Sequence, residues 1–382
     1  MDDHCAQFLH KLFRKGYSYN EMKLLFEENL NIYISVRHLR RLANSMGLYK
    51  RKQSNLEICY TVIQGILSKS SGSHGYRLVH QMCIKNNLVI SMETVRLILQ
   101  ILDPEGVSDR LRRRLKRRQY ISRGPNYMWH MDGYDKLKPY GIAIHGCIDG
   151  YSRNIIWLKA GVTNNDPKIV AGHYIQAVIK KNGFPRSMRS DFGTENKYVE
   201  QMQRFFHRNG MNSDHCYIYG SSTQNQRIEC LWAIFRKQCS QFWRNLFTDL
   251  KQHNKFDGSF LDQSLIRFCF MGLIQEDIRV FAASWNQHKI RSIKTSHSPS
   301  GRPHIMYNMP ELYDCEDFLC DIDADEVDVC LDECSFDHLP CDEDVYNLAN
   351  ILMAEVNWIR DVDPFNNVNL YIFLRNAISQ EL

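Results

Sequence analysis

Apolar residues recur at intervals of three and four along roughly the first 110 positions, a spacing typical of helices that bury one face. Residues 7–31 show this pattern with a break at Gly16, and residues 34–52 show it again. In the second segment Ser35 is a candidate N-cap and Gly47 a candidate helix end. The pattern predicts short helices over 1–52.

The predicted helix after Ser35 has one apolar stripe and one basic face. The basic face carries Arg37, Arg40 and Arg41. A short helix, a turn and a second helix with outward-facing Arg are typical of a helix-turn-helix DNA reader. A small helical bundle with a solvated basic face remains the alternative. A looser version of the pattern follows over 53–109, which we interpret as a second helical, helix-turn-helix-like region.

The pattern changes after Gly124. Short strand-like runs occur around 128–137, 140–161 and 187–192, and helical stretches ending at glycine occur at 167–183 and 197–210. This order predicts a mixed α/β domain over 125–300. The region 301–382 is acidic and largely aperiodic, with one further helical stretch near 345–362, and we expect it to be partly disordered.

Charge is distributed unevenly along the chain. Residues 311–382 contain 19 Asp and Glu against two Arg, a net charge of −17. Because the whole chain has a net charge of +5, the other 310 residues must carry +22. An Arg-rich run at 110–124 forms a basic linker between the helical regions and the α/β domain. A basic body favours a polyanionic partner, with nucleic acid the first candidate. The linker also suits a nuclear localisation signal, a DNA clamp or a solvated connection.

The stretch Asp191-Phe192-Gly193 raises a question of chemistry, because the same triplet binds magnesium in protein kinases. No glycine-rich phosphate loop, Val-Ala-Ile-Lys strand or His-Arg-Asp precedes it, so a kinase is excluded. Asp132 follows a second apolar strand, and Glu229 lies in a predicted helix. Two strand ends and a helix can bring three carboxylates together, and three oxygen ligands suit Mg²⁺ or Mn²⁺ better than zinc.

These residues occur within four motifs: "WHMDGYDKL", "GCIDGYSRNIIWL", "SDFGTEN" and "NQRIECLW". Together they resemble the core of retroviral-type integrases and related transposases. The resemblance implies an RNase H-like mixed five-stranded sheet flanked by helices. It also implies that Asp132, Asp191 and Glu229 are catalytic ligands of two Mg²⁺ or Mn²⁺ ions, and that Asp149 has a structural role.

The resemblance further implies DNA end cleavage and strand transfer, with DNA and further copies of the chain as partners and no organic cofactor. Arg227, Arg236 and Lys237, close to Glu229 in the sequence, are candidate DNA contacts. The sequence departs from the family where Asp-Asn-Gly is usual, since Phe192 stands in the middle position. Two alternatives stay open: a catalytically silent, domesticated DNA-binding protein, and an RNase H-like nuclease without strand transfer.

Composition indicates the cellular environment that we expect for the protein. No apolar run reaches the roughly 18 residues of a membrane span, so we expect a soluble, nuclear protein with reduced cysteines and no membrane partner. Five cysteines in the acidic region lack the paired Cys-x-x-Cys spacing of zinc sites. They are Cys315, Cys320, Cys330, Cys334 and Cys341. We expect a disordered or packed segment there in preference to a zinc site.

Overall fold

The computed structural model describes residues 3–48, 54–68, 74–111, 122–208, 215–221, 224–292, 299–336 and 338–381. The chain divides into two compact units. One comprises Met1–Arg118 with Gln287–Lys289, and the other Gln119–Asn286 with Ile290–Leu382. The border lies inside the predicted basic linker, most of which falls outside the described residues.

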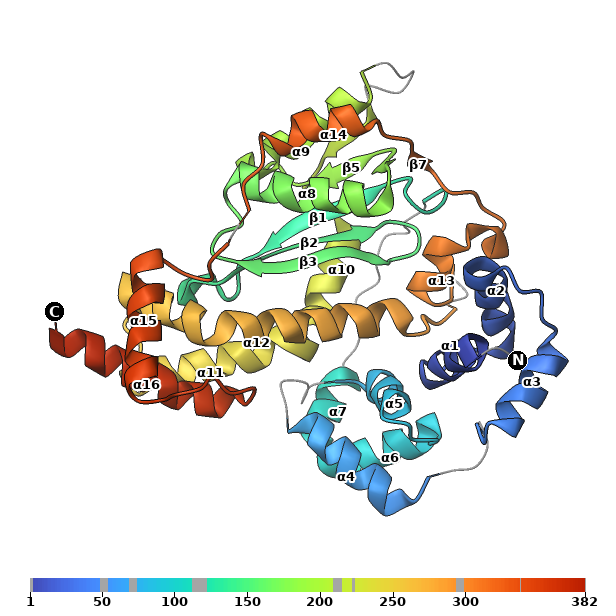
Figure 1. Cartoon of the computed structure of the whole chain (residues 1–382), viewed down its shortest axis with the longest axis horizontal. Helices are drawn as coiled ribbons and strands as arrows, with labels where there is room; N and C mark the ends of the chain where they lie inside the picture. The colour runs from blue at the N-terminus through green and yellow to red at the C-terminus, as the bar shows by residue number, and fades with distance from the viewer. Residues whose placement is uncertain are drawn as a thin grey trace. The chain divides into compact units, whose positions relative to one another are not determined.

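The described part of the first unit is helical (Figure 1). Its helices are α1 (Asp3–Arg14), α2 (Tyr19–Leu30), α3 (Val36–Ser45), α4 (Leu56–Leu67), α5 (Tyr76–Lys85), α6 (Met92–Leu102) and α7 (Pro104–Leu111). Side-chain caps define several starts: Ser18 and Glu21 form a capping box on α2, and Ser91 caps α6. The expected all-helical N-terminal region is confirmed.

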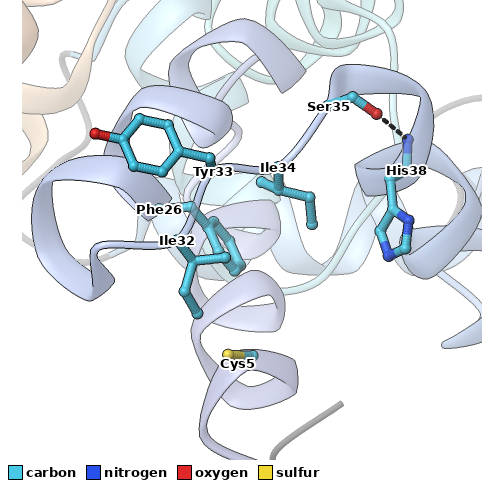
Figure 2. A pocket seen from close by; sticks show the side chains of 7 residues that line it. All are labelled: Cys5, Phe26, Ile32, Tyr33, Ile34, Ser35 and His38. Carbon is cyan, nitrogen blue, oxygen red and sulfur yellow. Dashed lines mark hydrogen bonds between the residues drawn. The ribbon is translucent and has the colours of Figure 1, made fainter.

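The start of α3 follows the predicted pattern. The Ser35 hydroxyl accepts a hydrogen bond from the backbone N–H of His38 at 3.2 Å, which Figure 2 shows beside a shallow pocket. Leu39 is fully buried, whereas Arg37, Arg40 and Arg41 are exposed. The Arg40 guanidinium lies over the Tyr19 ring, 5.5 Å from its centroid. Helix α3 therefore presents its basic face to the surface of this unit.

The second unit is built on a five-stranded mixed sheet with the order β3-β2-β1-β5-β6. The strands are β1 (Trp129–Tyr134), β2 (Ala143–Asp149), β3 (Ile155–Gly161), β5 (Met188–Ser190) and β6 (Tyr217–Tyr219). The pairs β1–β2 and β2–β3 are antiparallel, while β1–β5 and β5–β6 are parallel. The predicted α/β class with a mixed five-stranded sheet is confirmed.

Helices cover both faces of this sheet (Figure 1). On one face, Trp129 and Met131 of β1 pack with α8 (Pro167–Lys181) and α9 (Lys197–Phe206). On the other, Tyr134 and residues of β2 pack with α10 (Gln226–Phe235), α11 (Gln241–Gln252) and α12 (Phe260–Gln287). Because both faces are covered, β2 in the middle of the antiparallel part is buried at every position. Trp232, Phe235 and Trp243 lie in the second core.

The acidic C-terminal region differs from the partial disorder we expected. Its elements are α13 (Pro303–Asn308), β7 (Leu319–Cys320), α14 (Ala324–Leu331), α15 (Glu343–Glu355) and α16 (Pro364–Glu381). Strand β7 pairs with β4 (Phe184–Pro185), and both β7 and α14 pack against the α8 face. Helices α15 and α16 join the core on the opposite face. Apolar residues between the acids, such as Leu352, Leu370 and Leu374, explain this order because they are buried.

An ion network fixes the last helix to the body of the domain. The Asp262 carboxylate at the start of α12 is 1% exposed and accepts a hydrogen bond from the Arg375 guanidinium at 2.7 Å. Arg375 also pairs with Asp257 at 3.2 Å. Tyr371 donates to the Lys255 carbonyl at 2.8 Å. Helix α16 is therefore part of this unit.

Candidate functional site

The three predicted acids come from three neighbouring elements. Asp132 lies within β1, Asp191 follows the last residue of β5, and Glu229 lies in the first turn of α10. Parallel strands β1 and β5 pair Trp129 with Met188 and His130 with Arg189. The same register continued beyond the ladder brings Asp132 level with Asp191. Neighbouring strands lie about 4.8 Å apart, so the backbones of these two residues lie near each other.

Electrostatics connects the three acids. Burial raises the pKa of Asp132 to about 7, and the Asp191 and Glu229 carboxylates contribute to the rise. Burial and Asp191 also raise the pKa of Glu229, while Lys136 lowers it. Asp132 and Asp191 are partly buried and Glu229 is exposed. Negative charge therefore gathers at one place, and Lys136 is the cation that counters it at Glu229.

Few donors offset this charge. Trp232 donates its indole N–H to Asp132 at 2.8 Å, reaching it across Gly146, the residue opposite Asp132 on β2. A Cβ at position 146 would lie 2.8 Å from the Trp232 ring, so this arrangement requires glycine. Asp191 accepts from the Gly193 N–H at 3.2 Å and the Asn196 amide at 3.1 Å.

The donor set fits a hard divalent cation. Three carboxylates supply only oxygen, the ligand atom that Mg²⁺ and Mn²⁺ prefer, and their mutual repulsion is what a bound cation relieves. Within the described ranges, no three His, Cys, Asp or Glu side chains stand in an arrangement ready to hold an ion. The same holds for the described cysteines of the C-terminal region. We conclude that the acids are suitable in chemistry and require closer approach to share an ion.

Sequence reasoning missed the residue that joins two of the acid-bearing elements. Asn225, directly before α10, is 1% exposed. Its amide donates to the Met131 carbonyl at 2.9 Å, and its carbonyl oxygen lies 2.7 Å from Nδ1 of buried His130. Because that oxygen can only accept, the imidazole donates there. Asn225 thereby holds the start of the Glu229 helix to the strand segment just before Asp132.

A fourth acid was also missed. Glu195 lies in the single helical turn Thr194–Asn196 after Asp191. Burial raises the pKa of Glu195, and the nearby carboxylates of Asp191 and Asp135 raise it as well. Its position four residues after Asp191 was the only signal in the sequence, and such spacing within a loop has no fixed geometry. The acidic surface is therefore broader than three residues.

Asp149 at the end of β2 has the structural role that was expected. Its carboxylate is fully buried and accepts four hydrogen bonds, from the backbone N–H groups of Asn126, Tyr151 and Ser152 and from the Ser152 hydroxyl. Burial raises the pKa of Asp149 to about 6, while these donors lower it. The carboxylate thus fixes the tight connection between β2 and β3.

The predicted basic contacts of this domain have different surroundings. Arg227 is partly buried and donates to the Gly150 carbonyl at 2.8 Å, so it is held against the β2–β3 connection. Arg236 and Lys237 are exposed and begin a π-helical turn, Arg236–Ser240, between α10 and α11. The Arg236 guanidinium bonds the Gln241 side chain at 3.2 Å. The α-helical spacing that includes Glu229 therefore ends at Phe235, and Arg236 belongs to the π-helical turn.

The sheet order, the helices on both faces and the acids at neighbouring elements define an RNase H-like α/β domain. Residues 119–304 match the family model described as "Integrase core domain". This segment is a retroviral-type integrase core domain, which confirms the resemblance found in the sequence. The chain has no significant match among curated proteins.

The family gives the general function. An integrase core domain indicates an integrase- or transposase-like role, and domains of this family bind DNA and generally use divalent metal ions. Among the helices of the described residues, none has the length and hydropathy to cross a membrane.

Proposed function

We propose that this protein is a DNA-binding integrase of transposon type that cleaves DNA ends and joins them to target DNA with Mg²⁺ or Mn²⁺. The observation that carries the proposal is the shared field of three carboxylates, in which Asp191 and Glu229 both raise the pKa of Asp132. Acids from a strand, a strand end and a helix, clustered without matching cations, are a functional arrangement. A domain built only for shape gains nothing from them.

In this proposal Asp132, Asp191 and Glu229 hold two divalent ions. Such a pair of ions stabilises the attacking and leaving oxygens of an in-line phosphoryl displacement. The protein supplies the rest by positioning. Asn225 ties α10 to β1, so that Glu229 approaches Asp132 from a fixed direction. Trp232 orients the Asp132 carboxylate through its indole N–H.

DNA contacts would come from both units. The exposed face of α3 with Arg37, Arg40 and Arg41 suits a DNA groove or backbone, and Arg236 and Lys237 suit phosphates near the acids. Arg227 would contribute by holding the β2–β3 connection in place through its hydrogen bond to the Gly150 carbonyl. Joining two DNA ends requires two active sites, so we propose a homo-oligomer working in the nucleus.

The test is cleavage of the DNA ends that flank the gene, with Mg²⁺ or Mn²⁺. Glu229→Gln and Asp132→Asn each remove one negative charge while keeping shape, and each should lower the cleavage rate by at least about 1,000-fold. DNA affinity should be unchanged or slightly higher, because a carboxylate that repels phosphate is gone. Glu276→Gln, in an exposed ion pair with Arg279, is the matched control and should cleave normally.

A second candidate function is DNA binding or assembly without turnover. Two observations favour this candidate. The described acids do not form an arrangement that is ready to hold a metal ion, and Glu229 is exposed. Wild-type protein that binds its flanking ends but cleaves them with neither metal would establish this candidate. Cleavage by wild type that both Glu229→Gln and Asp132→Asn abolish would exclude it.

The role of α3 has its own test. Replacing Arg37, Arg40 and Arg41 with Ala should flatten the dependence of DNA affinity on salt, by about 0.9 in the log–log slope for each phosphate that the variant no longer neutralises. Arg279→Ala is a control for the general loss of an exposed arginine. An unchanged slope would mean that this helix faces solvent or another protein.

A further inference from the structure

One exposed aromatic side chain lies next to the acid cluster. Phe192 directly follows Asp191, and 74% of its surface is exposed. Its ring stacks on Tyr219 of β6, with 5.6 Å between ring centroids and 10° between planes. One face of Phe192 is thus covered by a parallel aromatic ring. A phenylalanine at such a position exposes apolar surface that burial would stabilise.

The ring beneath Phe192 is held firmly. The Tyr219 hydroxyl donates to Glu200 at 2.6 Å, and Glu200 in turn accepts from Arg204 at 3.0 Å. Tyr219 also packs against Tyr217, with 5.0 Å between ring centroids. Tyr217 is buried, and its hydroxyl lies 2.8 Å from that of Ser190. The three rings form a row from the buried sheet edge to the surface beside Asp191.

Such a row is suited to a flat aromatic ligand. Nucleobases stack on protein aromatic rings whatever their sequence, because every base has a π face. Successive Cα atoms are about 3.8 Å apart, so a ring bonded to the residue after Asp191 is within a nucleotide or two of a phosphodiester held by the acids. A base paired within a duplex hides its faces, whereas an unpaired base at a DNA end exposes them.

We propose that Phe192, supported by Tyr219, is a stacking site for an unpaired nucleobase at the DNA end, next to the phosphodiester that the acids act on. This rests on the proposed function. The occupant is a base of single-stranded or frayed DNA. The site holds the end open and sets its register against Asp132, Asp191 and Glu229. A purine, with its larger π face, binds there more tightly than a pyrimidine.

The test uses the full chain and DNA without a required sequence. One probe is a duplex with a short single-stranded overhang carrying 2-aminopurine, and the other is the same duplex closed by hairpins at both ends. Wild-type protein should bind the open probe more tightly and quench its fluorescence. Phe192→Ala should lose roughly five- to 100-fold in affinity for the open probe and lose the quenching. Affinity for the closed probe should not change.

Matched variants isolate stacking from hydrophobicity. Phe192→Trp should keep the quenching, and Phe192→Leu should lose it although leucine is apolar. Phe260→Ala, at another exposed phenylalanine of this domain, should behave as wild type. Thermal melting checks that all variants are folded, which the exposure of both side chains favours.

Each remaining outcome decides the proposal. Equal quenching by wild type and Phe192→Ala would overturn the proposal. A lower sedimentation coefficient for Phe192→Ala than for wild type would also overturn it, because it would place Phe192 between copies of the chain. If wild type cleaves its own ends but Phe192→Ala changes neither the affinity nor the quenching of either probe, the stacking proposal is wrong and the proposed function stands. If wild type binds neither probe, the proposed function fails together with it.

Discussion

Two aspartates on adjacent strands, in different regions of the same sheet, are surrounded in opposite ways. At the end of β2, Asp149 is fully buried yet accepts four hydrogen bonds. Within β1, Asp132 is less buried and its one side-chain donor is Trp232, while two carboxylates face it. Burial raises the pKa of both, to about 6 for Asp149 and about 7 for Asp132.

The difference separates Asp149, whose charge is met within the chain, from Asp132, which the proposed function places at the metal site. Donors compensate Asp149 within the chain, so its charge is settled by folding alone. At Asp132 the surroundings add negative charge, which leaves the compensation to something outside the chain. Depth of burial would have ranked the two residues in the wrong order. The balance of donors and like charges gives the ranking that the proposed function requires.

The largest effect expected from this comparison is on stability. Asp149→Ala leaves four buried donors without an acceptor and should lower the free energy of unfolding by about 3–5 kcal/mol. Asp132→Ala frees the Trp232 indole N–H and the Gly133 backbone N–H but also removes the repulsion from Asp191 and Glu229, so its cost should be smaller than that of Asp149→Ala, at most about 1–2 kcal/mol. Urea denaturation of both variants measures the contrast. Equal losses would mean that Asp132 also serves the fold.

A second effect depends on pH. Because the pKa of Asp132 is about 7 in the folded protein and its ordinary value is 3.8, the folded state binds more protons between these values. Wild-type stability should therefore fall as pH rises from about 4 to 7 on account of this residue. Asp132→Asn lacks this loss. Above pH 7 it should be more stable than wild type by about 2–4 kcal/mol, and near pH 4 the gain should vanish.

Magnesium sharpens the same measurement. Millimolar Mg²⁺ should stabilise wild type at pH 8, where Asp132 is ionised, and should have little effect on Asp132→Asn. Denaturation at two pH values with and without the ion gives all four comparisons. If Asp132→Asn were more stable than wild type by the same amount at both pH values, the gain in stability would not come from the ionisation of this carboxylate.

The smallest effect expected is at Asn225, which positions the acid cluster. Asn225→Ala removes the bonds to Met131 and His130 and should cost about 1–3 kcal/mol of stability. Its effect on cleavage should exceed its effect on DNA affinity, because Glu229 loses its fixed direction relative to Asp132. Asn366→Ala, at an exposed asparagine of α16, is the control. A fall in affinity alone would make Asn225 a residue that binds DNA directly.

Local patterns were sufficient to predict much of the fold. The apolar runs around 128–137 and 140–161 contain β1, β2 and β3, the helical stretches at 167–183 and 197–210 contain α8 and α9, and Ser35 caps α3. These features depend on neighbours in the sequence. Asp191 was predicted at a strand end and Glu229 in a helix, as the structure has them, whereas Asp132 was predicted after its strand and lies within β1. Asp149 was separated from them by the family motif.

Interactions between distant segments could not be predicted in this way. Asn225 meets Met131 across 94 positions, and the Phe192–Tyr219 stack joins a loop to a strand whose approach depends on sheet pairing. The order of the C-terminal region was missed because its many acids suggested solvation. Its scattered apolar residues have no clear period, and only the finished domain shows which surface they cover.

The bond between Arg375 and Asp262 has a consequence for the order of events during synthesis. Residue 262 leaves the ribosome more than a hundred positions before its partner. Until translation reaches residue 375, the Asp262 carboxylate lacks its guanidinium partner, and the apolar surface that α16 later covers stays open. The nascent domain must wait for that stretch of message, and a premature stop codon shortly before it would leave a product with an open side.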